Sequence, residues 1–235
     1  NITERYDGYG NSIRKVMEQK DRYKGIVGVV ADIIKTKKQY ETAIETALGG
    51  TIQNIVTDNE ETAKGLIAFL KQNKFGRATF LPLSAISGRD IRVDSSLTRE
   101  NGAVGFANQL VECDSEFTEL ARYLLGRILV VDNIDNALAI ARRHNHSLRI
   151  VTLEGDMLSP GGSMSGGAFK NSSNLLGRRR EIEELEASVS VKEAELKKSE
   201  EQLTAAREQL GALRTEVEQI RRQYRISSWQ RIQLQ

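Results

Sequence analysis

The stretch of sequence that decides the fold is Gly155-Asp156-Met157-Leu158-Ser159-Pro160-Gly161-Gly162-Ser163-Met164-Ser165-Gly166-Gly167. Glycine this dense is unusual in a regular strand or helix, because it weakens the interior of both. A strand without side chains lets a second backbone come within pairing distance. The stretch therefore favours edge-to-edge pairing with another chain, and a simple surface turn is the alternative interpretation.

The same glycines do not form a phosphate-binding or nucleophile motif. A phosphate loop places Lys and then Ser or Thr directly after the second glycine of a G-x-x-x-x-G frame. Here Gly161 to Gly166 is followed by Gly167 and Ala168, and Lys170 is out of register. A G-x-S-x-G elbow also fails, because Ser165 stands where its second glycine belongs. The pattern gives no support to nucleotide or acyl chemistry at this stretch.

Composition changes at Gly177, where a long helical pattern begins. All but one of the 19 glycines and both prolines lie at or before this residue. One heptad position beyond it is apolar in every repeat, which indicates a coiled coil of roughly 70 Å. Its members are Ile182, Val189, Leu196, Leu203, Leu210, Val217 and Tyr224.

A coiled-coil seam needs a partner helix, and the N-terminus is the candidate within this chain. Ile2, Tyr6, Tyr9 and Ile13 follow a spacing of four, three and four residues. Residues 1–9 are predicted to be the end of an incoming helix that pairs antiparallel with the outgoing one. The alternative is an amphipathic helix that docks on its own globular domain.

Between these ends the sequence predicts an α/β domain with an internal repeat. Strands are expected at 26–30, 52–56 and 78–81, with helices at 38–48 and 60–72. In a repeat, a helix ends at glycine, an apolar strand follows, and Asp-Asn starts the next helix. The first copy runs from Ala47 to Asn59 and the second from Leu124 to Asn133, with a helix at 134–143 and a strand at 148–153 after the second.

Bulk composition and isolated polar residues limit the possible functions. The formal net charge of +2 gives no global attraction to nucleic acid or anionic membrane. The single cysteine, Cys113, suits a reducing cytosol, and no apolar run approaches the roughly 20 residues of a membrane span. His144 and His146 lack further ligands at metal-binding spacing, so they are interpreted as residues at a helix C-terminus. No catalytic set stands out, and neither a cofactor nor a metal is expected.

The glycine-rich stretch before a coiled coil resembles the hinge of the structural maintenance of chromosomes (SMC) family, in its bacterial form. Gly155-x6-Gly162-x3-Gly166-Gly167 follows the hinge pattern G-x6-G-x3-G-G. Residues 25–32, 43–50 and 101–110 also look like bacterial hinges. The resemblance implies a hinge fold of two similar subdomains that homodimerises through two interfaces around a central opening, with Gly155, Gly162, Gly166 and Gly167 in those contacts.

The resemblance further implies binding of DNA, preferentially single-stranded and without sequence specificity, near the junction of hinge and arm. On this chain the matching cations are Lys170, Arg178, Arg179 and Arg180. Family members are cytoplasmic, nucleoid-associated ATPases of chromosome condensation, partition and sister chromatid cohesion. Their ATP-binding heads, and the kleisin-type partners that bind there, belong to other parts of the protein. The hinge itself is not expected to be an enzyme.

These inferences divide the chain into five segments. They are the end of the incoming arm with a short leading helix (1–19), the first hinge subdomain (20–83), a linker (84–100), the second hinge subdomain (101–176) and the outgoing arm (177–235).

The second hypothesis for function is a small-molecule-binding α/β domain or enzyme that oligomerises through its coiled coil. The absence of a positioned phosphate-binding lysine and of a catalytic acid–base set favours the hinge hypothesis over this second one.

Overall fold

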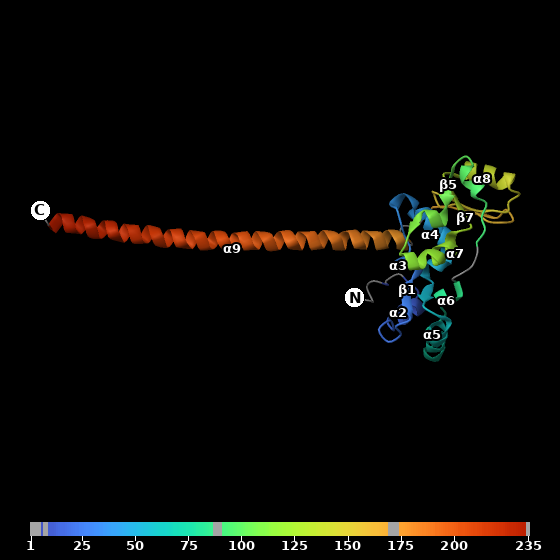
Figure 1. Ribbon diagram of the computed structural model, residues 1–235, viewed down its shortest axis with the longest axis horizontal. Coiled ribbons are helices and arrows are strands. Elements are labelled where there is room, and N and C mark those ends of the chain that lie inside the picture. The colour runs from blue at the N-terminus through green and yellow to red at the C-terminus, as the bar shows by residue number, and fades with distance from the viewer. Residues whose placement is uncertain (1–5, 7–8, 87–90, 169–173, 234–235) are drawn as a thin grey trace. The chain divides into compact units, whose positions relative to one another are not determined.

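The computed structural model describes residues 6, 9–86, 91–168 and 174–233 (Figure 1). Residues 1–181 form one compact unit, and residues 182–235 form a second. The first unit contains helices and several sheets, whereas the second belongs to the long helix α9 (Leu175–Gln233). This confirms the predicted mixed α/β class followed by a long helix. The subdomain boundaries proposed from the sequence stay predictions.

The first sheet has the strand order β1-β3-β4, with β3 antiparallel to β1 and parallel to β4. The predicted strand at 52–56 starts later than expected, because residues 49–53 form a 3-10 turn after the helix. The elements are β1 (Ile26–Val29), α3 (Val30–Ile33), β2 (Lys35–Thr36), α4 (Glu41–Leu48), β3 (Ile55–Thr57), α5 (Glu60–Asn73) and β4 (Phe80–Pro82).

The second sheet has the order β10-β9-β8-β7-β5, and its last three strands repeat the first sheet. β7 is antiparallel to β5 and parallel to β8, as β3 is to β1 and β4. The elements are β5 (Ala103–Phe106), β6 (Val111–Glu112), α7 (Thr118–Leu125), β7 (Ile128–Val131), α8 (Ile134–Arg143), β8 (Arg149–Thr152), β9 (Met157–Leu158) and β10 (Met164–Ser165).

The predicted repeat extends to individual hydrogen bonds at the Asp-Asn pairs. Asn59 is the N-cap of α5, and its side-chain oxygen accepts the backbone N–H of Thr62 at 3.0 Å. Asn133 caps α8 in the same way and accepts the N–H of Asn136 at 2.9 Å. An asparagine side chain at this position satisfies a helix N–H that otherwise lacks a partner. The sequence echo therefore reflects two equivalent helix starts.

A glycine approaches each Asp-Asn pair from a neighbouring strand. The carbonyl of Gly25 accepts the N–H of Asp58, and the carbonyl of Gly102 accepts the N–H of Asp132, both at 2.9 Å. A Cβ atom on Gly25 would lie 2.4 Å from Asp58 Oδ1, and one on Gly102 would lie 2.5 Å from Asp132 Oδ1. Only glycine fits at these two contacts.

Corresponding strands of the two halves pair with each other and share one core. β2 pairs antiparallel with β6. Between the sheets, α4 and α7 bury a joint apolar cluster, while α5 and α8 cover the outer faces of the two sheets. Figure 1 accordingly shows α5 and α8 at opposite ends of the compact unit with α4 and α7 between them. The cluster also contains Leu175 and Leu176, so the start of α9 is part of the core.

The remaining described elements are short. They connect the longer helices and the strands. They are α2 (Asn11–Met17), α6 (Leu83–Ile86), and 3-10 turns at Lys38–Tyr40, Gly49–Gln53, Ser95–Arg99, Ala107–Gln109 and Ser115–Phe117.

Candidate functional site

The glycine-rich stretch folds into a hairpin at the edge of the second sheet. β9 pairs with β8, and β10 pairs with β9, in both cases antiparallel. β10 is the terminal strand of the order β10-β9-β8-β7-β5. Every residue from 160 to 168 is exposed, and 54% of the surface of Met164 is accessible. An edge strand of this kind presents backbone N–H and C=O groups to any strand that approaches it.

Two of the four predicted contact glycines lie in turns of this hairpin. Gly155 has φ +94° and closes the β8–β9 turn, with its N–H donating to the carbonyl of Thr152 at 3.0 Å. Gly162, also at φ +94°, donates its N–H to the carbonyl of Ser159 at 3.0 Å across Pro160 and Gly161. A proline followed by a glycine of positive φ is typical of a type II turn. The N–H groups of Gly155 and Gly162 thus close turns within this chain.

The other two glycines directly follow β10. A Cβ atom on Gly166 would stand 2.3 Å from Oδ1 of Asp156, so its close approach is to its own chain. Gly167 has φ +133°, and a Cβ there would meet no atom within 4 Å. The backbone at Gly167 is consequently bare and accessible. The assignment of all four glycines to a dimer contact stays a prediction.

The first sheet lacks the two outer strands that the second sheet has beyond β8. β4 occupies the place in its sheet that β8 occupies in the second sheet. β8 is followed outward by β9 and β10, whereas β4 is the terminal strand of the order β1-β3-β4. Pro82 ends β4, which suits an edge because proline cannot donate a ladder hydrogen bond. Among the described strands, β4 therefore ends its sheet, whereas its counterpart β8 does not.

The start of α9 is held by the compact unit through backbone groups. The side chain of Asn174 accepts the N–H of Gly177 at 2.8 Å, as an N-cap does. Oε1 of Glu45, a buried residue of α4, accepts the N–H of Leu175 at 3.0 Å. Burial raises the pKa of Glu45 to about 7, although hydrogen bonds from the backbone of Leu175 and Leu176 oppose the shift. Desolvation therefore outweighs the stabilisation of the charge at the helix terminus.

Of the predicted DNA-binding cations, two have acidic partners within the compact unit. Nε of Arg180 lies 2.5 Å from Oε1 of Glu41, whose side chain is only 6% exposed. Nε of Arg179 lies 3.8 Å from Oδ1 of Asp32. Arg178 is exposed. Lys170 lies outside the described residues. Asp32 and Glu41 offset the charges of Arg179 and Arg180, and of these three arginines only Arg178 is exposed.

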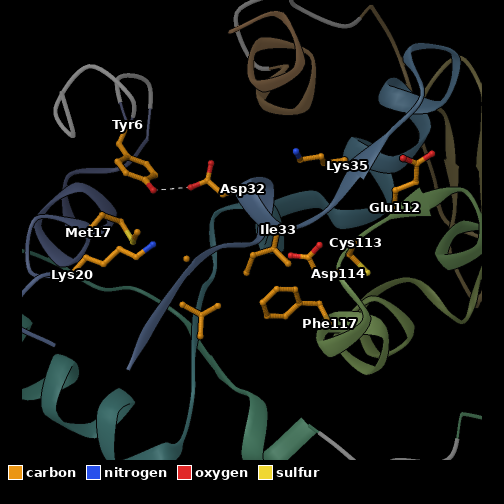
Figure 2. A pocket seen from close by; sticks show the side chains of 12 residues that line it. Tyr6, Met17, Lys20, Asp32, Ile33, Lys35, Glu112, Cys113, Asp114 and Phe117 are labelled. Carbon is orange, nitrogen blue, oxygen red and sulfur yellow. Dashed lines mark hydrogen bonds between the residues drawn. The ribbon is translucent and has the colours of Figure 1, made fainter. Parts of the chain in front are cut away.

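Asp32 also contacts the beginning of the chain. The hydroxyl of Tyr6 donates to Oδ2 of Asp32 at 2.7 Å (Figure 2). The Tyr6 ring packs edge-on against Tyr9, with centroids 5.3 Å apart. The carboxylate of Asp32 thus lies between Tyr6 and Arg179. Tyr6, near the beginning of the chain, and Arg179, in the first turns of α9, therefore contact the same side chain.

One cleft of the compact unit does not have the composition of a catalytic site. It measures about 590 Å³, and its walls include Lys20, Lys35, Glu112 and Asp114, so charges of both signs line it (Figure 2). Burial, followed by the charge of Asp114, raises the pKa of the Cys113 thiol in its wall, which disfavours the nucleophilic thiolate. Across the described ranges, no group of three or more His, Cys, Asp or Glu side chains could hold a metal ion.

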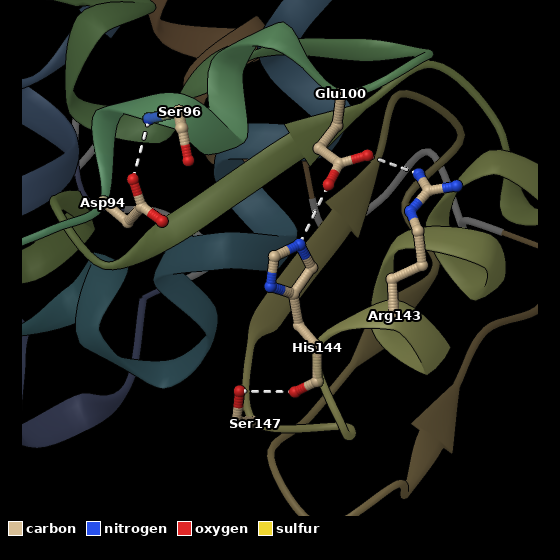
Figure 3. Close-up of polar contacts among 6 residues, drawn as sticks. All are labelled: Asp94, Ser96, Glu100, Arg143, His144 and Ser147. Atoms are coloured by element: carbon tan, nitrogen blue, oxygen red, sulfur yellow. Dashed lines mark hydrogen bonds and ion pairs between the residues drawn. The ribbon is translucent and has the colours of Figure 1, made fainter.

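His144 is the C-cap of α8 and His146 follows two residues later, so both lie near the C-terminus of the helix, as predicted. Nε2 of His144 lies 2.9 Å from Oε1 of Glu100, and Arg143 pairs with the other oxygen of that carboxylate (Figure 3). Hydrogen bonding to His144, together with the charge of Arg143, lowers the pKa of Glu100. The backbone carbonyl of His146 accepts the N–H of Gly161 at 2.8 Å. Both residues hold neighbouring loops in place.

The fold, the glycine-rich edge and the buried start of α9 agree with one known family. Residues 23–141 match the family described as SMC proteins Flexible Hinge Domain. The chain belongs to the SMC hinge family. Within the part of the chain that the structure describes, no helix is both long and apolar enough to cross a membrane.

Individual relatives agree with this assignment. The chromosome partition protein Smc of Bacillus subtilis is 43% identical over 191 residues, which cover 80% of this chain and 16% of that protein. This chain therefore spans about a sixth of the length of that relative. The relatives are named for chromosome partition and not for a catalysed reaction.

Solved hinge structures resemble the fold described here. The asymmetric dimer of the Geobacillus stearothermophilus SMC hinge domain has a TM-score of 0.74 at 38% identity, covering 88% of this chain and 84% of that one. The Pyrococcus furiosus SMC hinge domain has a TM-score of 0.56 at 32% identity, covering 72% and 91%. These likenesses extend the family assignment to the tertiary fold.

Proposed function

We propose that this chain is the homodimerisation hinge of a bacterial SMC protein that acts in chromosome condensation, partition and sister chromatid cohesion. The observation that carries the proposal is the exposed backbone edge formed by β10 and Gly167 at the end of a five-stranded sheet. An unprotected edge in a monomer invites pairing with another strand. The asymmetric dimer formed by the Geobacillus stearothermophilus hinge supports the same role.

The second open edge suggests how two copies join. In our proposal β10 of one protomer pairs with β4 of its partner, extending the second sheet of one copy into the first sheet of the other. Two-fold symmetry then creates the same contact twice, because each protomer offers one β10 and one β4. Two contacts separated by the width of the compact unit leave an opening between the copies.

The arm is proposed to be half of an antiparallel coiled coil. Its heptad positions are exposed in this chain, from Ile182 at 38% to Tyr224 at 72%, so the seam needs a partner helix. Tyr6 and Arg179 both contact Asp32, so residue 6 lies near the first residues of α9. Chain upstream of residue 1 would supply the partner helix and lead towards the ATP-binding heads. Kleisin-type partners would bind at those heads.

DNA binding is proposed at the start of the arm, through Arg178 and Lys170 first. Arg179 and Arg180 would contribute less, since Asp32 and Glu41 neutralise part of their charge. Contacts of this type bind phosphate without reading sequence and weaken with salt. Such binding, preferring single strands, would associate the protein with the cytoplasmic nucleoid.

Site-specific cross-linking tests the dimer. In a Cys113→Ser background, cysteine is placed at Thr79 beside β4 and, in turn, at Ser163, Ser165 or Ala168 around β10. At least one pair should form a cross-linked dimer under mild oxidation, whereas each single cysteine should not.

Met164→Asp should give a folded monomer in sedimentation, because it places a charge on the pairing edge. Ile67→Asp, on the exposed side of α5, is the matched control and should remain dimeric. A dimer that survives Met164→Asp without any β4–β10 cross-link contradicts this interface.

The DNA proposal has a separate measurement. Arg178→Glu should weaken binding of a twenty-nucleotide oligo(dT) and lower the slope of log affinity against log salt by about 0.7 for each phosphate that the variant no longer neutralises. Arg207→Glu, far along the exposed arm, should leave both quantities unchanged. An unchanged slope for Arg178→Glu removes that residue from the site.

A further inference from the structure

A second groove lies where β7 and β8 begin, and the hinge function does not account for it. Its volume is about 520 Å³, and residues of the 91–97 segment, α7 and the starts of both strands line it. Pro160 of the β9–β10 turn also lines it. The apolar part of the lining consists chiefly of Leu97, Phe106, Leu124, Ile128 and Leu148.

Exposed apolar side chains gather at this groove. Val93 is 42% exposed and Tyr123 is 40% exposed, and both line it. Among the described residues of the compact unit, only Ile67 and Met164 are other large hydrophobic side chains with comparable exposure. Exposed apolar groups concentrated in a concave surface with a polar rim are typical of an interaction site.

The charged side chains around the groove are predominantly basic. Arg92, Arg127 and Arg149 line it, against one acidic residue, Asp94. Arg127 and Arg149 are exposed, and neither forms an ion pair with any residue that the structure describes. Oδ1 of Asp94 accepts the N–H of Ser96 at 2.9 Å, and hydrogen bonding to Ser96 lowers the pKa of Asp94. The groove therefore carries a net positive charge.

Contacts within the compact unit hold one wall of the groove in place. The segment that contains Asp94 continues to Glu100, which pairs with Arg143 and His144 at the end of α8 (Figure 3). Ser147, another lining residue, donates its hydroxyl to the carbonyl of His144 at 2.7 Å. A preorganised surface loses less conformational entropy on binding than a loose one.

We propose that this groove binds an acidic segment of a partner protein that inserts an aliphatic or aromatic side chain between Tyr123 and the apolar floor. Carboxylates of that segment pair with Arg127 and Arg149 on the rim. The lining contains three arginines, a tyrosine and no lysine, which is the composition of protein–protein interfaces and of their hot spots. Single-stranded nucleic acid fits less well, because it needs several exposed aromatic faces, and Phe106 is only 4% exposed.

Peptide selection tests the proposal without a known partner. The full chain is immobilised, and random twelve-residue peptides displayed on phage are selected for binding. The enriched peptides should carry acidic residues around a leucine, isoleucine or phenylalanine. Their affinity, measured by fluorescence anisotropy with synthetic copies, should fall at least tenfold in the variant Arg127→Glu/Arg149→Glu. Arg142→Glu is the matched control, since Arg142 is exposed on α8 and does not line the groove; its affinity should change less than twofold.

Four results overturn the proposal. The selection yields no acidic peptide with an apolar anchor, or such peptides bind the double variant as tightly as the parent chain. Alternatively, the double variant loses oligo(dT) binding while peptide binding is unchanged, which assigns the groove to nucleic acid. Lastly, sedimentation shows that the double variant changes the oligomeric state, which assigns the groove to a second copy of this chain. The first three results leave β10–β4 pairing, as measured by cross-linking, unaffected.

Discussion

Glu45 makes the stability of the compact unit depend on pH near neutrality. This buried carboxyl on α4 accepts the N–H of Leu175, and its second oxygen, Oε2, has no hydrogen-bond partner among the described residues. Desolvation, and to a smaller extent the charge of Glu41, raise its pKa from an ordinary 4.5 to about 7. Replacement of Glu45 by glutamine removes the charge and keeps an acceptor for Leu175.

The size and sign of the effect follow from proton binding. Between pH 4.5 and pH 7 the folded state holds a proton on Glu45 that the unfolded chain has released. The free energy of unfolding therefore falls as the pH rises through this window. Each pKa unit corresponds to about 1.4 kcal/mol, so the charged carboxylate costs the folded state about 3 kcal/mol above pH 7. Most of that decrease, about 2–3 kcal/mol, occurs between pH 5 and pH 8.

Urea unfolding at pH 5 and pH 8 measures this contribution. Near-UV circular dichroism of tyrosine is a suitable signal, because Tyr224 is the only one of the six tyrosines beyond residue 181. Relative to the parent chain, Glu45→Gln should gain about 2–3 kcal/mol of stability on going from pH 5 to pH 8. At any single pH the glutamine also buries an amide N–H group without a partner, which costs about 1–3 kcal/mol. The change with pH is therefore the informative quantity.

The control is Glu154→Gln, an exposed glutamate in the β8–β9 turn, which should shift stability equally at both pH values. The reasoning is refuted if Glu45→Gln and the parent chain lose stability in parallel between pH 5 and pH 8. That result would mean that Glu45 titrates near its ordinary pKa, and that water reaches its carboxyl.

Substitutions at three further positions test the local features that build the fold. Gly102→Ala should destabilise the compact unit by at least about 2 kcal/mol in urea unfolding, because φ is +84° and the new Cβ would meet Asp132 at 2.5 Å. Gly211→Ala, where a Cβ meets no atom, should instead raise the thermal stability of α9 by about 0.5–1 kcal/mol, measured by far-UV circular dichroism. Asn133→Ala should cost about 1 kcal/mol in urea unfolding through loss of the α8 cap, and Asn133→Asp should retain most of that stability.

The arginines near the arm illustrate what sequence could not predict about the candidate site. A run of three arginines reads as one basic cluster, and its sequence suggests a common role for all three. In the fold, successive helical residues point in different directions, so Arg179 and Arg180 reach acidic side chains while Arg178 is exposed. Their partners Asp32 and Glu41 lie more than a hundred residues away in sequence, and no local pattern relates them to the arm.

The groove at Arg127 and Arg149 gave no signal in the sequence for a similar reason. Its lining residues come from five separate segments between residues 92 and 160, and each segment reads by itself as an ordinary strand, helix or turn. Likewise, pairing of the two-residue strands β2 and β6 joins the halves without any hydrophobic alternation long enough to detect.

Sequence alone determined the class of fold, the internal repeat, the start of the long helix and the unusual backbone of residues 155–167. Each of these follows from local chemistry: heptad spacing, Asn caps, and the conformations open only to glycine. Tertiary structure alone decided which arginines have acidic partners and which strands end each sheet. These properties depend on contacts between distant segments, and their partners are specified only when the two sheets pack around α4 and α7.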